Sequence, residues 1–212
     1  EQSNVFLHYV LDLWVDWWRK HHARGDVIIV RYADDFVLGF QYRSDAEQFQ
    51  DALQTRLQKF GLELHPEKTC LLEFGRFAES NRRQRGQGKP ETFDFLGLTH
   101  YCSRTRKGWF VIKRRSSTKR LRAKLADIKV SLRRRMHVPP RLQGQWLQSV
   151  VRGWFQYHAV PFNRESLGRF RTGVIRLWHW ALRRRSQKGR SWNWSRMQRL
   201  AHRWIPPARI LH

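Results

Sequence analysis

The sequence predicts an α+β protein in two parts: antiparallel hairpins with helices come first, and an all-α basic bundle follows. The first observation is the hydrophobic periodicity, which is mixed up to about residue 112 and helical from about Ser116 onward. The second is charge: residues 1–100 hold 13 Lys and Arg against 15 Asp and Glu, whereas residues 101–212 hold 29 against two. Both patterns change near the same place, which indicates two structural parts.

Length and composition exclude several classes of protein. The 212 residues suffice for one or two domains with a core, and a hydrophobic content of 41% argues against disorder. The apolar runs are far shorter than the roughly 18 to 20 residues of a membrane span, and the N-terminal residues lack a secretory pattern. Cys70 and Cys102 form no CxxC pair, so we expect neither a disulfide framework nor a zinc site. These features predict a cytoplasmic protein.

The first 61 residues predict a helix, a hairpin and a second helix. Residues 4–22 repeat apolar side chains at helical spacing. VIIVRYADDFVLGF, residues 27–40, reads as two strands around a tight turn at residues 33–35, and we expect both faces of this hairpin to be buried. Residues 44–61 predict a helix with Ser44 as its N-cap, Glu47 completing a capping box and Gly61 ending it.

The next 50 residues predict more strands, which would complete a βαβ-type layer. LELHPEKTCLLEF, residues 62–74, resembles a strand, a turn and another strand. Residues 79–91 are polar and contain glycine, so we expect a mobile loop. TFDFLGLTHYCS and GWFVIKRR then predict a second hairpin, joined by a turn at residues 104–108.

Beyond Ser116, apolar residues recur at helical spacing in three successive segments and then in a short fourth. The markers of the three segments are Leu121, Leu125, Ile128 and Leu132; Leu142, Trp146, Val150 and Trp154; and Leu167, Phe170, Val174, Leu177 and Ala181. The fourth segment spans Ser195 to Trp204 and is followed by Pro206 and Pro207. These segments predict a helical bundle.

The charge of this bundle needs an external partner. A solvated helical face mixes both signs of charge, but residues 101–212 contain only Asp127 and Glu165 as acids. A polyanion is the expected partner, and nucleic acid is the obvious one. Eight of the eleven tryptophans lie in the same half, where they could stack on bases or form the core. Their helical spacing favours the core.

Two adjacent carboxylates, Asp34 and Asp35, interrupt the apolar run of residues 27–40. Aspartate is common in exposed turns, so an ordinary turn is one interpretation. The apolar flanks and the basic bundle favour another, a site where divalent metal ions act on phosphates, because Mg²⁺ prefers carboxylate and phosphate oxygens. Bound metal would also offset the repulsion between the two carboxylates.

The residues around this pair resemble reverse transcriptases, in particular the bacterial group II intron reverse transcriptase/maturases. Tyr32-Ala33-Asp34-Asp35 matches the YxDD signature of that family. GLELHPEKT at 61–69, FDFLGLTHY at 93–101 and VVRGWFQYHAV at 150–160 follow in the family's order. The resemblance extends over essentially the whole chain and implies an RNA-directed DNA polymerase, a nucleotidyltransferase that uses Mg²⁺.

The resemblance also implies roles for single residues. Asp34 would be a ligand of catalytic Mg²⁺ and Asp35 a second carboxylate there, with Tyr32 and Ala33 beside the primer end and the incoming nucleotide. Lys68 would protonate the leaving pyrophosphate, or it is simply a solvated turn lysine. The segment that supports the primer strand would comprise Phe95, Leu96 and Gly97, although the first two could equally be core residues.

The resemblance further implies a palm, a thumb and the start of a DNA-binding region at residues 1–112, 113–190 and 191–212. The partners would be intron and template RNA, a DNA primer or target, and dNTP, in the bacterial cytoplasm. Candidate phosphate-binding residues are Lys113, Arg114, Arg115, Lys119, Arg120, Arg122, Lys124, Arg133, Arg134 and Arg135.

One departure from the family pattern is important. The family's polymerase site uses three carboxylates, and the first lies on a strand well upstream of YxDD. Asp12 and Asp16 lie on a predicted helix and cannot be that residue by motif. We therefore interpret the chain as the C-terminal half of a palm plus a thumb, and expect another chain or an upstream fingers/palm segment to supply the third carboxylate. The alternative is a non-catalytic RNA-binding maturase module that assists intron splicing.

Overall fold

The structure, a computed structural model, describes residues 2–211, without the side chains of residues 2, 3, 188 and 190. The chain forms two compact units, unit 1 (Glu1–Glu73) and unit 2 (Phe74–His212). Each unit combines helices with one small antiparallel sheet, which confirms the predicted α+β class.

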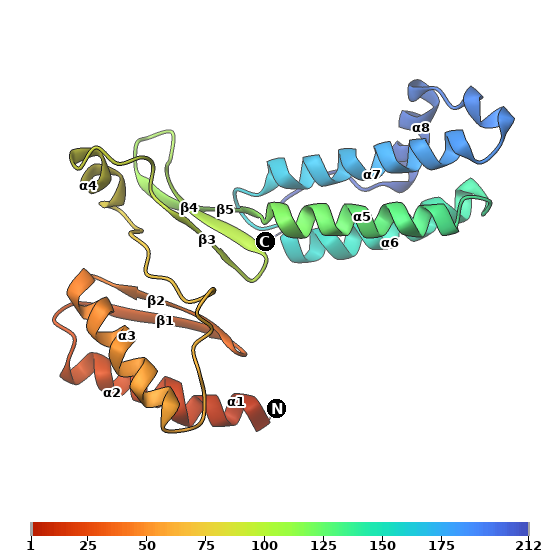
Figure 1. Cartoon of the computed structure of the whole chain (residues 1–212). Coiled ribbons are helices and arrows are strands. Elements are labelled where there is room, and N and C mark those ends of the chain that lie inside the picture. Colours follow the sequence, from red (N-terminus) through yellow and green to blue (C-terminus); the bar gives the residue numbers. More distant parts are fainter. Residues whose placement is uncertain (1, 212) are drawn as a thin grey trace. The chain divides into compact units, whose positions relative to one another are not determined.

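Unit 1 packs a β-hairpin against two helical segments (Figure 1). The first segment is continuous and consists of α1 (Gln2–Leu7), the π-helical turn η1 (His8–Asp12) and α2 (Leu13–His21). The hairpin consists of β1 (Val27–Tyr32) and β2 (Asp35–Phe40), and α3 (Arg43–Gln58) follows. Both predicted helices and the predicted hairpin are confirmed.

The core of unit 1 forms between the two helical segments and one face of the hairpin. The spacing of Phe49, Leu53 and Leu57 places them on one stripe of α3, where they are buried against Val15 and Trp18 of α2. The prediction that both faces of the hairpin are buried is wrong. Alternate residues of β1 point away from the core, and Ile28 and Val30 are 65% and 55% exposed.

The start of α3 differs from the prediction in its N-cap residue and in the role of Asp45. The helix begins at Arg43 with Tyr42 as its N-cap, so Ser44 is not the N-cap. Asp45 is buried and accepts hydrogen bonds from the backbone N–H groups of Arg24 and Gly25, at 2.8 and 3.2 Å. The first turn of α3 thereby fixes the loop that leads into β1.

Two predictions for the middle of the chain are also wrong. Residues 62–74 form no strand, although their apolar and polar residues alternate. Residues 79–91 are not wholly a loop, because α4 (Ala78–Gln84) begins within the polar stretch, with Ala78 buried. The strands of the chain form two separate sheets rather than one βαβ-type layer.

The sheet of unit 2 has three strands in the order β3-β4-β5: β3 (Thr92–Phe95), β4 (Leu98–Arg104) and β5 (Phe110–Ser116). The predicted hairpin with its turn after Arg104 is confirmed as β4 and β5. The segment TFDFLGLTHYCS does not form a single strand, because it reverses at Leu96 and Gly97 and pairs with itself.

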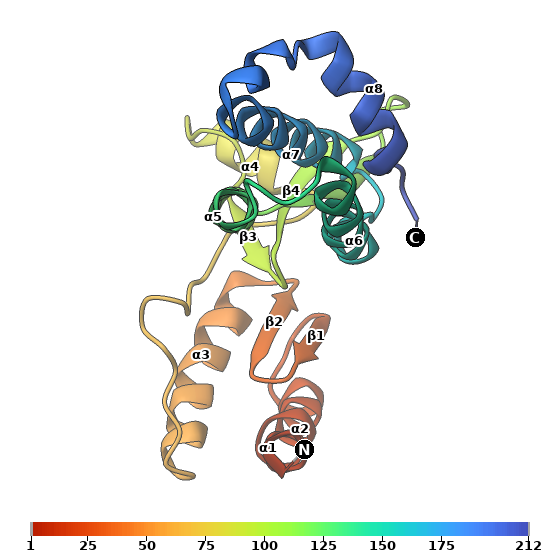
Figure 2. The ribbon, with the colours of Figure 1, turned by 90° about the vertical axis from the view of Figure 1, so that its right-hand side faces the viewer.

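The helical part of unit 2 begins directly after β5. It consists of α5 (Thr118–Arg134), α6 (Pro140–His158), α7 (Arg164–Arg184), the 3₁₀ turn η2 (Gln187–Ser191) and α8 (Trp194–Trp204). Figure 2 looks almost along the axes of α5, α6 and α7, which lie side by side. All four helices predicted beyond Ser116 are confirmed.

The bundle has an apolar core that also contains buried polar side chains, among them Gln143 and Asn163. Phe170, Val174 and Trp178 are fully buried, so most of the apolar stripe of α7 faces its neighbours. Gln143 of α6 is also fully buried: it accepts a hydrogen bond from Trp178 Nε1 at 2.8 Å and donates to the carbonyl of Arg135 at 2.7 Å. Gln143 thus links α6 to α7 and to the end of α5. None of the helices in the described part combines the length and apolar character needed to cross a bilayer.

Candidate active site and nucleic-acid interface

The YADD motif forms the tip of the β1–β2 hairpin. Tyr32 pairs with Asp35 as the last pair of the ladder, which leaves Ala33 and Asp34 as a two-residue loop. Ala33 has a φ of 55°, and a positive φ at the first loop position alone is the pattern of a type II′ turn. Glycine is usual there, and an alanine costs about 1 kcal/mol. This unusual turn directs two consecutive aspartates toward solvent.

The two carboxylates are exposed and have no cationic partner. Within residues 2–211, neither Asp34 nor Asp35 lies within 4.0 Å of a Lys, Arg or His nitrogen. Exposed carboxylates without partners suit a hard divalent cation, which takes oxygen ligands. No group of three or more His, Cys, Asp or Glu side chains that could hold a metal occurs among the described residues. The described tip therefore offers two carboxylates to a metal.

Arg31, the residue before the motif, anchors the tip to the helical segment. Its guanidinium donates two hydrogen bonds of 2.7 Å to the Asp12 carboxylate and one of 2.8 Å to the carbonyl of Ala33. The Arg31 side chain is only 15% exposed. Arg31 holds the pKa of the Asp12 carboxyl below its usual value, mainly through these hydrogen bonds. The turn residue with positive φ is thus fixed by a charged pair, a feature that sequence reasoning missed.

Tyr32 and Lys68 lie in the same unit as the two aspartates. The Tyr32 ring is 66% exposed and shares the open face of β1 with Ile28 and Val30. Lys68 is exposed in a turn in which its N–H and that of Thr69 donate to the carbonyl of His65. The structure shows no contact that brings Lys68 to the carboxylates, so its role in proton transfer stays a prediction.

Phe95, Leu96 and Gly97 lie in unit 2, at the turn between β3 and β4. Leu96 and Gly97 have φ values of 50° and 77°, which is the pattern of a type I′ turn. Two bonds attach this turn to the helical part: Tyr157 Oη donates to the Leu96 carbonyl at 2.7 Å, and Ser117 N to the Gly97 carbonyl at 3.0 Å. A Cβ at Gly97 would lie 2.8 Å from the Arg120 guanidinium, so this glycine permits a close approach.

The ten predicted phosphate-binding residues lie on two neighbouring elements. Lys113, Arg114 and Arg115 are on β5, and the other seven are on α5 or directly after it. Within the described residues, none of the ten is within 4.0 Å of a carboxylate. Most of them are exposed, whereas Lys113, Arg114 and Lys124 are half-buried. Lys113, Arg115 and Arg135 each lie over an aromatic ring, which leaves their charge in place. Cations that no carboxylate neutralises are available to an external polyanion.

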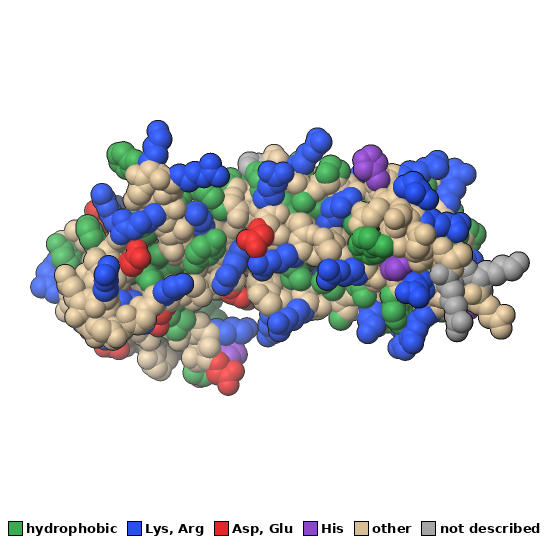
Figure 3. All heavy atoms as spheres, turned by 90° about the horizontal axis from the view of Figure 1, so that it is seen from above, with side chains coloured by type: hydrophobic (Ala, Val, Ile, Leu, Met, Phe, Trp, Pro, Cys, Tyr) green, Lys and Arg blue, Asp and Glu red, His purple; other side chains and the backbone are tan. Residues whose placement is uncertain are grey.

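Figure 3 shows one face of the molecule, on which Lys and Arg side chains are spread widely. In its right-hand part, over α7 and α8, basic side chains appear without acidic ones. The excess of basic over acidic residues in the C-terminal half of the sequence is therefore present at the surface of these helices.

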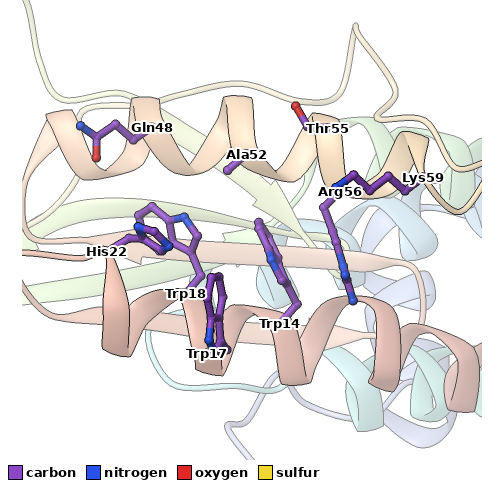
Figure 4. A pocket seen from close by; sticks show the side chains of 9 residues that line it. All are labelled: Trp14, Trp17, Trp18, His22, Gln48, Ala52, Thr55, Arg56 and Lys59. Atoms are coloured by element: carbon purple, nitrogen blue, oxygen red, sulfur yellow. The ribbon is translucent and has the colours of Figure 1, made fainter.

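A groove of about 430 Å³ lies between α2 and α3 of unit 1 (Figure 4). The indoles of Trp14 and Trp18 line it and pack against Phe49 in the core, as expected for tryptophans at helical spacing. Arg56 also lines the groove but is already engaged, since it donates to the Val10 carbonyl and lies 4.7 Å from the Phe60 ring centre. The groove follows mainly from the packing of the two helices.

Comparison with known families finds a match to part of the chain. Residues 2–100 match the family described as reverse transcriptase (RNA-dependent DNA polymerase). The matched segment contains the YADD hairpin and the Leu96–Gly97 turn. No curated protein matches the chain. The predicted resemblance to reverse transcriptases is thus confirmed over residues 2–100, and it indicates a function related to RNA-directed DNA polymerases.

Proposed function

We propose that this chain is part of a group II intron-type reverse transcriptase, which extends a DNA primer on an RNA template and also binds intron RNA. The observation that carries the proposal is the hairpin tip: two exposed, unpaired carboxylates lie on a turn with positive φ, inside the segment that matches reverse transcriptases. Carboxylates free of protein partners are available for metal and phosphate.

The proposed reaction is nucleotidyl transfer. The 3′ oxygen of the primer bonds to the α-phosphorus of a dNTP, and pyrophosphate leaves. Asp34 and Asp35 would hold Mg²⁺, which when bound stabilises charge on the attacking and leaving oxygens. A third carboxylate would come from a segment outside these 212 residues. Lys68 would donate a proton to the pyrophosphate, and Tyr32 and Ala33 would border the primer end and the nucleotide.

Unit 2 would hold the nucleic acid. Phe95, Leu96 and Gly97 would support the primer strand, and their attachment through Tyr157 and Ser117 supports a rigid role. The ten basic residues on β5 and on or directly after α5, which no described carboxylate neutralises, would bind template and intron phosphates. In this proposal residues 1–112 act as half of a palm, 113–190 as the thumb and 191–212 as the start of a DNA-binding region, in the bacterial cytoplasm.

A second candidate is a non-catalytic maturase module that grips structured RNA and assists splicing. Two observations favour the maturase module. The helices carry many basic residues, whereas the described hairpin tip has only two carboxylates for a metal. This candidate needs the helices of unit 2 but no metal at the hairpin tip.

Primer extension separates the two candidates. The chain is mixed with a separately supplied upstream polypeptide that carries the third carboxylate, together with an RNA template, an annealed DNA primer, dNTPs and Mg²⁺. We expect extension by the wild type and none by Asp34→Asn, while an Asp51→Asn control remains active. Full RNA affinity without extension in this mixture would leave only the maturase module.

A further inference from the structure

A second groove lies in unit 2, between the N-terminal end of α4 and the turn that joins β4 to β5. It has a volume of about 390 Å³, and we call it the Trp109 groove after its more exposed aromatic side chain. Arg76, Phe77 and Ser80 line it from the side of α4, and Arg104, Lys107 and Trp109 line it from the hairpin. None of the ten predicted phosphate-binding residues lines this groove. The turn that carries Trp109 follows the segment that matches the reverse transcriptase family.

Two aromatic rings in this groove are uncovered. Trp109 is 70% exposed and Phe77 is 66% exposed, and Trp109 has the highest exposure of any large hydrophobic residue in the described chain. Neither belongs to a core cluster. Rings that leave their faces in water can accept a planar partner, and nucleobases stack on such rings regardless of sequence.

Cations accompany the rings. Three basic residues line the groove and no acidic residue does. Arg104 is partly engaged, since it pairs with Glu79 at 3.3 Å and donates to the Gly108 carbonyl at 3.4 Å. Arg76 and Lys107 have no carboxylate within 4.0 Å among the described residues, and the Arg76 guanidinium lies 5.9 Å from the Phe77 ring centre. The groove therefore has positive charge that no described carboxylate neutralises: Arg76 lies over the Phe77 ring, and Lys107 lines the same groove as Trp109.

Both walls of the groove are fixed in place. On the hairpin side, Thr105 and Trp109 exchange hydrogen bonds, with Thr105 N donating to the Trp109 carbonyl at 2.8 Å and Trp109 N to Thr105 Oγ1 at 3.2 Å. On the side of α4, Gly75 N donates to the sulfur of Cys102 in β4 at 3.3 Å. The ring of Phe74 packs edge-on against Phe93 of β3 at 5.0 Å. A preformed site loses less conformational entropy when a ligand binds.

We propose that the Trp109 groove binds one nucleotide of a single-stranded nucleic acid. The base would stack on Trp109 or Phe77, and Arg76 and Lys107 would contact the flanking phosphates. The volume suits a small ligand, because pockets of about 300 to 1,000 Å³ accept such molecules. An acidic protein segment would satisfy the cations but would leave the two rings without planar partners. This inference depends on the proposed function in one respect: the proposed function brings nucleic acid to unit 2.

Photocrosslinking tests the site directly. The whole 212-residue chain is mixed with a single-stranded 12-mer that contains 5-iodouridine, irradiated, digested with trypsin and analysed by mass spectrometry. Cleavage after Lys107 and Lys113 releases the peptide of residues 108–113, and cleavage after Arg76 and Arg82 releases residues 77–82. We expect nucleotide adducts on Trp109 and Phe77. A DNA 12-mer with 5-iododeoxyuridine shows which sugar the groove prefers.

Two matched pairs of variants measure the contribution to affinity. Trp109→Ala should weaken binding of the RNA 12-mer about fivefold or more, because stacking on one ring contributes at least that much. Trp17→Ala removes a 48% exposed tryptophan of α2, outside the groove and outside the proposed binding regions, and should have a smaller effect. Lys107→Gln should reduce the log–log salt slope by about 0.7, one single-strand phosphate contact, whereas Lys89→Gln in an exposed loop should not.

The proposal is overturned if nucleotide adducts occur only on peptides from α5 to α8 and if the groove variants change RNA affinity and its salt slope no more than their controls do. In that case an acidic protein segment becomes the better occupant of the groove. That result would leave the proposed polymerase function standing, because RNA binding by the helices would be intact. If the wild-type chain does not bind the RNA 12-mer at all, the proposed function is contradicted instead.

Discussion

Replacing Arg31 tests whether a charged pair holds the candidate metal-binding turn. Arg31→Gln removes two hydrogen bonds of 2.7 Å to the Asp12 carboxylate and the one to the Ala33 carbonyl. An exposed ion pair contributes at most about 1 kcal/mol, and breaking a buried one costs about 3 to 5 kcal/mol. Because the side chains of Arg31 and Asp12 are 15% and 27% exposed, we expect a cost of about 2 kcal/mol, between these limits.

Hydrogen exchange locates that loss in the hairpin. A cost of about 2 kcal/mol corresponds to roughly 30-fold faster exchange of the protected amides, measured by mass spectrometry on peptides covering residues 27–40. The control is Arg19→Gln, which breaks a more exposed pair with Asp16 in the same unit and should change exchange less than about threefold. If Arg31→Gln changes exchange in the hairpin no more than Arg19→Gln does, the anchoring argument is refuted.

The Arg31–Asp12 pair also predicts how the stability of the hairpin depends on pH. The pKa of Asp12 is lowered in the folded chain, so its stabilising effect is full above the unfolded value, near 4, and is lost as the pH falls through the lowered folded value. After correction for intrinsic exchange, protection of residues 27–40 in the wild type should therefore decrease below about pH 4. Arg31→Gln should show little of this dependence.

The remaining predictions concern unit 2 and its partner. Gln143→Leu should destabilise the bundle by about 2 kcal/mol in chemical denaturation, since it leaves the buried Trp178 N–H without a partner and removes the bond to the Arg135 carbonyl, whereas exposed Gln145→Leu should be nearly neutral. Gly144→Ala should cost about 1 to 3 kcal/mol in the same assay, because its Cβ would lie 2.6 Å from the Trp204 ring. If eight cations contact phosphates, RNA affinity should fall with salt with a log–log slope of about −6 to −7, and a flat dependence would contradict nucleic-acid binding.

The helices were predictable because burial imposes a 3.6-residue period on the sequence, as with Phe170, Val174 and Ala181 on α7. Strands were less predictable because a strand needs a partner as well as a pattern. Residues 62–65 alternate like the start of a strand, but residues 62–74 join neither of the two sheets in the described chain. The polar segment at α4 carries little apolar periodicity, yet it starts at Ala78, which is buried in the folded unit. Local sequence does not show that burial.

The same distinction applies to the candidate site. The adjacent aspartates and the tight turn could be predicted, because both are local features of YADD. The Arg31–Asp12 anchor could not, since it joins a strand to a helix through the fold. The Trp109 groove was missed for the same reason: Phe77 and Trp109 come from separate elements, and neither stands out in its own segment.

The central claim is that the hairpin tip binds a divalent metal, and Mn²⁺ tests this in the chain as it is. In NMR spectra of the labelled protein, substoichiometric Mn²⁺ should broaden the amide signals of residues 32–36 first, and excess Mg²⁺ should restore them. The Asp34→Asn, Asp35→Asn double variant should lose the effect. Broadening that is strongest near other exposed carboxylates, such as Asp51 or Glu63, and that leaves the tip unaffected would contradict the claim.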